Sequence, residues 1–132
     1  MATIFSRIIK GEIPCYKIAE DERFFAFLDI NPVAKGHTLV VPKQETDYFF
    51  DLDPEWVGGM MIFSRKIAHA IDRAMKCKRT AVAVVGLEVP HAHVHLIPLN
   101  AMEDFSFAKP KLKLTKEEFE EVARKIRAEI RD

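Results

Sequence analysis

The sequence has few of the features that mark several large classes of protein. It contains only two cysteines, Cys15 and Cys77, which lie far apart and lack the spacing of a metal-binding pair. Such thiols fit a reducing compartment better than a disulfide framework, so we expect a cytoplasmic protein. No apolar run approaches the roughly 18 residues that a membrane span needs, and residues 1–7 show no basic segment leading into an apolar stretch. We therefore expect neither a membrane anchor nor a secretion signal.

An excess of charge of either sign is also missing. The 20 Lys and Arg residues are matched by 20 Asp and Glu residues, so the formal net charge is zero. A neutral chain exerts no long-range attraction on polyanions, which argues against nucleic acid as a partner. Internal repeats, low-complexity tracts and Gly/Ser-rich linkers are absent from the 132 residues. We expect one domain over residues 1–132.

The spacing of apolar residues predicts three helices and five strands. Asp53 before Pro54 marks the start of a long helix, and Thr115 with Glu118 has the pattern of a capping box before a last helix. Short hairpin links favour a mostly antiparallel sheet, hence an α+β fold with a five-stranded sheet, one long central helix, a short N-terminal helix and a C-terminal helix. The predicted elements are a helix at 4–10, strands at 16–19, 23–28 and 37–41, a helix at 54–75, strands at 79–85 and 89–99, and a helix after residue 115.

One segment carries the residues of chemical interest. His91, His93 and His95 alternate with apolar residues, so a strand would send three imidazoles to one face. His37 opens another predicted strand and could reach the same face if the two strands are neighbours. His69 lies in the middle of the long helix, where we expect a partly exposed side chain.

Three interpretations of this row are open. It could be a polar stripe on a half-buried strand, although Thr, Lys or Glu would serve such a face equally well. It could be a metal site, because imidazole is a common metal ligand. However, side chains at positions i and i+4 of a strand start about 13 Å apart, so at most two neighbouring histidines of the row could bind the same ion.

The third interpretation is phosphoryl chemistry. Imidazole has a reference pKa near 6.5 and is largely neutral at pH 7, so one ring can attack phosphorus while a neighbour assists with proton transfer. The attacking ring needs a fixed acceptor for its other N–H, which we expect to be a backbone carbonyl. The five glycines match neither G-x-G-x-x-G nor a Walker A loop, so no Gly-rich loop competes for the phosphate.

The chain resembles the histidine triad (HIT) family, whose signature is His-φ-His-φ-His-φ-φ with φ apolar. That pattern is matched by residues 91–97. Other segments resemble the N-terminal half of Hint-type nucleoside phosphoramidases, and the resemblance covers about residues 3–98. These segments are Thr3-Ile4-Phe5, Ile8-Ile9, Glu12-Ile13-Pro14, residues 26–32 and residues 37–43.

The resemblance implies roles for the four histidines. By position, His93 corresponds to the nucleophile that forms a nucleotidyl-histidine. His91, His95 and His37 correspond to residues that orient it, contact phosphate and assist proton transfer.

A nucleotide pocket is implied as well. Asp29 matches the carboxylate that binds the ribose hydroxyls, and Phe5, Phe27 and Ile30 match the apolar residues around the base. A carboxylate can accept two vicinal hydroxyl protons, and apolar walls suit a purine, although Phe27 and Ile30 would also serve as core residues. Glu88 stands where other members place a small hydroxyl or an acidic residue; it could favour amine leaving groups or be an ordinary exposed glutamate.

The sequence departs from the family pattern at two places. Thr3, Ser6 and Glu45 stand where many members carry a Cys-x-x-Cys zinc pair and a histidine, so we expect no structural zinc and no cofactor. The usual Gly-Gln before the triad is Gly86-Leu87, which removes one contact to phosphate or leaving group.

The histidine row and the resemblance together predict a nucleotide hydrolase or transferase that acts at the α-phosphate of a purine nucleotide conjugate of AMP or GMP type. The conjugate is either a nucleoside phosphoramidate or a dinucleotide or nucleoside polyphosphate. Two alternatives are a nucleotide-binding regulatory module with little turnover and a His-ligated metal site. The resemblance also implies a homodimer with one continuous sheet. The apolar strand at 79–85 would otherwise present a bare edge.

Overall fold

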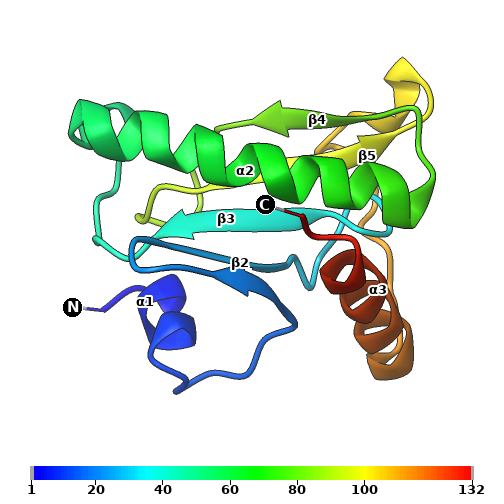
Figure 1. Cartoon of the computed structure of the whole chain (residues 1–132), viewed down its shortest axis with the longest axis horizontal. Helices are drawn as coiled ribbons and strands as arrows, with labels where there is room; N and C mark the ends of the chain where they lie inside the picture. Colours follow the sequence, from blue (N-terminus) through cyan, green and yellow to red (C-terminus); the bar gives the residue numbers. More distant parts are fainter. Residues whose placement is uncertain (1, 132) are drawn as a thin grey trace.

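The computed structural model describes residues 2–131, and its elements follow the predicted order (Figure 1). The fold class is confirmed as α+β. The helices are α1 (Ile4–Ile9), α2 (Pro54–Met75) and α3 (Lys116–Ala128), and the strands are β1 (Lys17–Glu20), β2 (Phe24–Leu28), β3 (Thr38–Pro42), β4 (Arg79–Ala83) and β5 (Val94–Leu99). Two short 3-10 helices, η1 (Phe49–Asp51) and η2 (Met102–Asp104), were not predicted.

The five strands form one sheet in the order β1-β2-β3-β5-β4, and every pair is antiparallel. β3 and β5 are far apart in the sequence but are neighbours, with Leu39 opposite His95. The sheet therefore brings the strand that follows His37 next to the histidine row.

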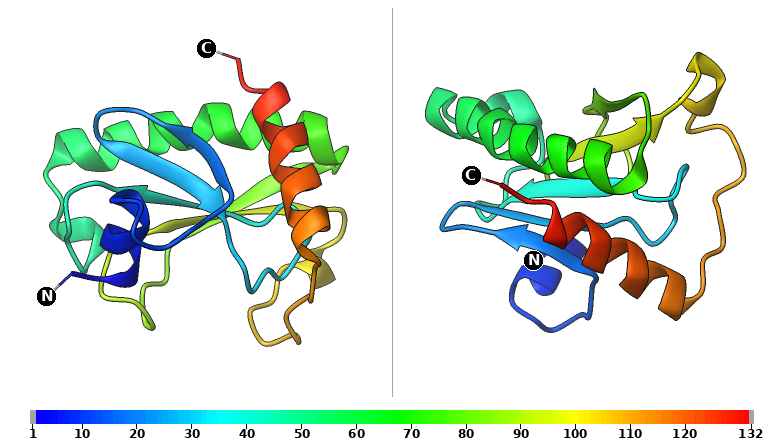
Figure 2. Two further views of the ribbon diagram at one scale, coloured as in Figure 1. Left: turned by 90° about the horizontal axis from the view of Figure 1, so that it is seen from below. Right: turned by 45° about the vertical axis from the view of Figure 1, so that its right-hand side comes forward.

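Both faces of the sheet are covered, which explains why all five residues of β2 are buried. Phe24 and Leu28 point into a core shared with α2 and α3, whereas Phe25 and Phe27 pack on the opposite face with Phe5 of α1. The left view of Figure 2 shows the sheet between α2 and α1. This alternation leaves the α1 face for the histidines and for the cavity described below.

The predicted ends of two strands are wrong. β4 ends at Ala83 rather than at residue 85, and β5 begins at Val94 rather than at residue 89. The register of β3 on β5 would place Pro42 opposite Ala92, and proline has no N–H for the ladder. The Ala92 N–H instead donates to the Thr46 carbonyl at 2.7 Å. His91 and His93 therefore lie on an irregular segment that leads into the strand.

The predicted helix ends agree closely with the structure. Thr115 and Glu118 form the expected capping box of α3. Asp53 precedes α2 as predicted, but its side chain makes no capping hydrogen bond. Cys15 and Cys77 are both free thiols. In the described range 2–131, none of the helices has the length and apolar character that crossing a bilayer requires.

Candidate active site

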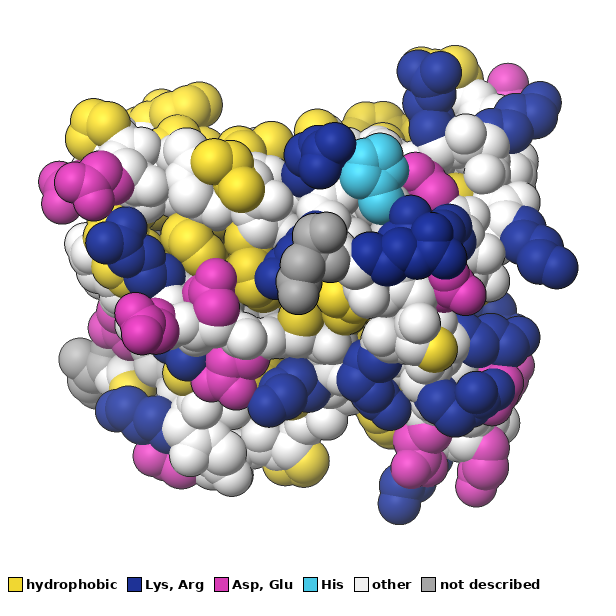
Figure 3. Space-filling model, in the orientation of Figure 1, with side chains coloured by type: hydrophobic (Ala, Val, Ile, Leu, Met, Phe, Trp, Pro, Cys, Tyr) yellow, Lys and Arg dark blue, Asp and Glu magenta, His cyan; other side chains and the backbone are white. Residues whose placement is uncertain are grey.

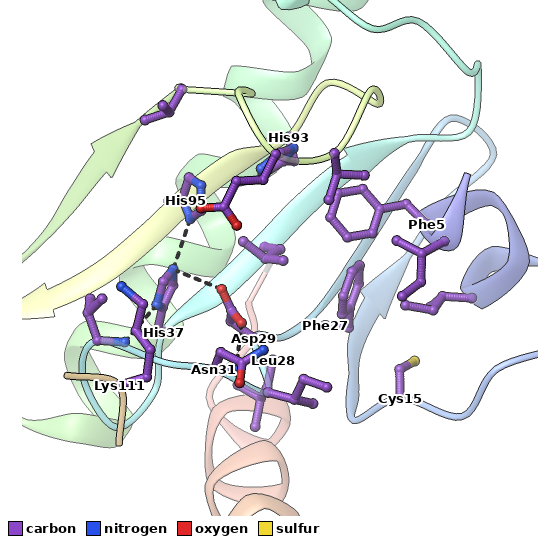
Figure 4. A pocket seen from close by; sticks show the side chains of 18 of the residues that line it. Phe5, Cys15, Phe27, Leu28, Asp29, Asn31, His37, His93, His95 and Lys111 are labelled. Carbon is purple, nitrogen blue, oxygen red and sulfur yellow. Dashed lines mark hydrogen bonds and ion pairs between the residues drawn. The ribbon is translucent and has the colours of Figure 1, made fainter. Parts of the chain in front are cut away.

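A cavity of about 500 Å³ opens on the α1 face of the sheet (Figure 4). Its walls come from α1, from β2 and the turn after it, from the loop before the histidine row, and from the segment that precedes α3. Every predicted site residue except His91 lines it. Tertiary structure thus brings together side chains from the first 5 residues of the chain to residue 111.

His91 is completely buried and lies behind the cavity wall. One of its ring nitrogens, Nε2, is 2.8 Å from the Pro42 carbonyl oxygen, and the other, Nδ1, is 2.7 Å from Thr3 Oγ1. A carbonyl can only accept, so Nε2 carries the proton. Burial lowers the pKa of His91. The neutral ring therefore accepts the Thr3 hydroxyl proton at Nδ1, and neither nitrogen is free for a phosphate.

His93 lines the cavity and has a fixed orientation. Its Nδ1–H donates to the backbone carbonyl of His91 at 2.8 Å, as expected from the sequence. In the neutral ring this bond leaves the lone pair on Nε2. The Phe5 ring packs edge-on against the imidazole, with 5.0 Å between ring centroids.

His37 and His95 form a hydrogen-bonded pair. The Val33 N–H donates to His37 Nδ1 at 3.1 Å, so neutral His37 carries its proton on Nε2 and donates it to His95 Nδ1 at 2.9 Å. Burial lowers the pKa of His37 to about 3 and the pKa of His95 to about 4. Both rings are neutral at pH 7. The proton of His95 therefore lies on Nε2.

Asp29 lies next to this pair, at the start of the turn after β2. Its Oδ2 is 3.6 Å from His37 Nε2, a polar contact with a neutral ring rather than an ion pair. Its Oδ1 accepts the Asn31 N–H at 2.8 Å. Burial raises the pKa of the Asp29 carboxyl. The carboxylate lines the cavity and retains acceptor capacity for a ligand.

One end of the cavity is apolar. Phe5 and Phe27 are buried there with their rings edge-to-face at 5.6 Å, so these residues belong to the core and line the cavity as well. Cys15 lies at the same end (Figure 4). Ile30 lines the rim and remains 63% exposed, and Glu88 lies on the exposed loop before the histidine row.

Phe107 and Lys111 are among the cavity residues that were not predicted from the sequence. Phe107 and Lys111 come from the segment between β5 and α3, which has no periodic pattern. The Phe107 ring centroid is 4.9 Å from that of His95, and Lys111 Nζ donates to the Phe107 carbonyl at 2.6 Å. The Leu112 N–H donates to the Pro32 carbonyl at 2.9 Å, which holds the segment beside the Asp29 turn. This long-range bond and the contact of Phe107 with His95 explain why the segment reaches the site.

The residues present do not suit a metal ion at this site. Asp29, His37 and His95 offer ligand atoms within 4.8 Å of one another, the one such group found in residues 2–131. A metal would need the lone pair of His37 Nε2, but the Val33 N–H already occupies Nδ1 and keeps the proton on Nε2. Binding a metal would break one of these bonds.

Comparisons with known proteins identify the family of this chain. Residues 10–102 match the model of the HIT domain family. An uncharacterized HIT-like protein of Borreliella burgdorferi is 36% identical over 96% of this chain and 97% of its own length. The adenosine 5'-monophosphoramidase hnt1 of Schizosaccharomyces pombe is 32% identical over 99% of this chain and 100% of its own. The crystal structure of a zinc-bound histidine triad family protein from Mycobacterium smegmatis superimposes with a TM-score of 0.84 at 32% identity, covering 98% of this chain and 93% of that one. The chain therefore belongs to the HIT domain family.

Proposed function

We propose that this protein hydrolyses purine nucleotide conjugates at the α-phosphate through a nucleotide covalently bound to His93. The observation that carries the proposal is the bond from His93 Nδ1–H to the His91 carbonyl, because it fixes the tautomer with a lone pair on Nε2. The relationship to a fungal adenosine 5'-monophosphoramidase supports the reaction class.

The reaction has two displacements. His93 Nε2 attacks phosphorus, a P–N bond forms, and the bond to the leaving group breaks as that group takes up a proton from solvent. Water then attacks the same phosphorus and loses a proton to solvent, the electron pair of the P–N bond returns to His93 Nε2, and the nucleoside monophosphate leaves. His95 carries its proton on Nε2, opposite the nitrogen that accepts from His37, so it can donate to a phosphate oxygen.

The substrate is held on both sides of the reacting phosphorus. Asp29 accepts hydrogen bonds from the ribose hydroxyls, and the apolar end with Phe5 and Phe27 encloses the purine. Glu88 and Lys111 both line the cavity and carry opposite charges. We propose a phosphoramidate as the substrate, in which an amine leaves toward Glu88 and the phosphate interacts with Lys111.

The test compares His93→Ala with variants of the other histidines. An AMP ester with a good leaving group is mixed with enzyme, quenched without acid, and analysed by intact mass and peptide mapping. We expect an AMP adduct on His93, and we expect His93→Ala to lose nearly all turnover while AMP affinity stays within about threefold. His95→Gln and His37→Gln should turn over more slowly and still form the adduct.

Other outcomes would change the assignment. An adduct on another histidine, or full activity in His93→Ala, would refute the nucleophile. A wild-type protein that binds AMP but releases no product above the His93→Ala background would instead be a nucleotide-binding module.

We also propose a homodimer joined at β4, with residues 1–132 as a single domain in each subunit. The outer edge of β4 has no partner strand within residues 2–131. Val82 on this strand is 50% exposed, and Ile62 on α2 is 74% exposed. Figure 3 shows hydrophobic side chains along the top of the molecule, over α2 and β4.

We also propose that the protein is located in the cytoplasm, and the free thiols support this location.

A further inference from the structure

The start of α1 is bonded to the residue that holds His93. Thr3 is the N-cap of α1, and its Oγ1 accepts the Ser6 N–H at 3.1 Å. The same oxygen is 2.7 Å from His91 Nδ1, which is 88 residues away in the chain. Because His91 Nδ1 has no proton, the single hydroxyl proton of Thr3 goes to His91 rather than to Ser6 Oγ, 3.2 Å away.

A distant carboxylate completes this cap. In α3 the capping box is local, because Glu118 follows Thr115 by three residues and accepts its N–H at 2.9 Å. In α1 the corresponding position is Ser6, and the acceptor of the Thr3 N–H is Glu45, at 3.0 Å. Glu45 also accepts a hydrogen bond from the Ser6 hydroxyl, which lowers the pKa of the Glu45 carboxyl and favours its charged form. The α1 cap therefore exists only in the folded chain.

The bonds continue from this cap to the cavity. His91 is held between Thr3 and the carbonyl of Pro42 at the end of β3, and the carbonyl of His91 accepts the N–H of His93. The Phe5 ring of α1 packs against both imidazoles, at 5.6 Å from His91 and 5.0 Å from His93. A shift of α1 would thus reach the nucleophile by two routes.

We propose that Thr3, supported by Ser6 and Glu45, is a positioning residue that fixes the His91 ring and through it the orientation of His93. This inference rests on the proposed function, since it assigns a task to His93. None of the three residues lines the cavity, so their effect is on the nucleophile and not on the substrate.

Zinc does not fit this cluster. Thr3, Ser6 and Glu45 occupy the places of the zinc ligands of many relatives, but they offer two hydroxyls and one carboxylate and no thiolate. The side chains are already bonded to one another and to His91. We infer that hydrogen bonds in this chain do the structural work that a metal can do at the same place.

The kinetic test uses the two N-cap threonines as a matched pair. Thr3→Val and Thr115→Val each remove a hydroxyl that accepts a backbone N–H at 3.1 Å, but only Thr3 bonds to His91. With an AMP ester as substrate, we expect Thr3→Val to lower kcat about tenfold and to change KM less than about twofold. Thr3→Ser should restore kcat to within about threefold, and Thr115→Val should keep the wild-type kcat.

A second variant covers the case in which Thr3→Val does not fold. Glu45→Gln keeps the size of an exposed side chain and removes its charge, and Glu118→Gln is its counterpart in α3. We expect kcat to fall about threefold in Glu45→Gln and to be unchanged in Glu118→Gln.

An activity-independent readout separates this inference from the proposed function. Imidazole 15N NMR reports which ring nitrogen carries the proton. In the wild type we expect protonated Nε2 in His91 and protonated Nδ1 in His93. In Thr3→Val we expect a changed 15N shift of His91 Nδ1, which loses its hydrogen-bond donor, and mixed tautomers in His93, whereas Thr115→Val should show neither change. If the wild type shows these tautomers but no turnover, the proposed function fails and the positioning stands. If Thr3→Val matches Thr115→Val in tautomers and in kcat, the positioning is refuted.

Discussion

Neutral histidines inside the site make the stability of this protein depend on pH. Burial holds the pKa of His37 at about 3 and that of His95 at about 4, whereas both rings have their ordinary pKa in the unfolded chain. Below about pH 6.5 the two rings are protonated in the unfolded chain but remain neutral in the folded protein. The two rings therefore do not reduce the free energy of unfolding above about pH 6.5, and they reduce it progressively as the pH falls toward 3 or 4.

We predict a loss of about 2 kcal/mol in unfolding free energy per ring between pH 6.5 and pH 5. Asp29 opposes this trend at the acid end, because burial raises its pKa and the folded carboxyl binds a proton more readily. Urea unfolding at a series of pH values measures the slope. His37→Gln should flatten the curve, whereas His69→Gln, which removes a half-exposed ring on α2, should not. An unchanged slope in His37→Gln would contradict the neutral buried ring.

Among the elements, the segment that leads from β5 to α3 adds a positive charge to the cavity. Its Phe107 packs on His95, and its Lys111 lines the cavity. Lys111 also helps to lower the pKa of His37, after burial and His95, and the pKa of His95, after burial and His93. The segment therefore presents a cation to any phosphate that reaches His93.

We predict that Lys111→Gln lowers kcat/KM for an AMP phosphoramidate about tenfold at low ionic strength and weakens its dependence on salt. Lys109→Gln is the matched control, because it removes the same charge two residues earlier from a side chain that lies outside this cavity. Steady-state rates at several salt concentrations provide the measurement. Equal losses in the two variants would show that net charge alone, and not contact with the substrate, is responsible.

On the scale of the whole molecule, the bare edge of the sheet and the apolar side chains beside it bear on assembly. Strand β4 lies at the end of the sheet, and exposed Val82 and Ile62 would lose contact with water in a dimer. We predict a mass in solution of twice 15.1 kDa.

The double variant Val82→Glu/Ile62→Glu should shift this mass to that of one chain, because each glutamate would be buried without a partner in the interface. Leu112→Glu, at an exposed apolar residue before α3, should leave the dimer intact. Sedimentation equilibrium at micromolar concentration distinguishes the two masses. A wild-type protein with the mass of a single chain would contradict the proposed interface.

Several features followed from the sequence because their causes are local. The alternation of His91, His93 and His95 with apolar residues indicated one polar face, and the structure places Ala92 and Val94 in the opposite core. Thr115 and Glu118 predicted the start of α3, because both residues of a capping box lie within four consecutive positions. The family followed from residues 91–97, since that signature is also a contiguous stretch.

Only the tertiary structure decided which histidine nitrogens carry protons and which residues line the cavity. His91, part of the same row, turns away from the cavity because the Pro42 carbonyl and the Thr3 hydroxyl meet its ring from two distant segments. Lys111 enters the cavity because a backbone bond holds its segment next to Pro32. Burial and partners far along the chain determine which nitrogen carries a proton and which residues line a cavity. No local pattern of residues predicts either feature.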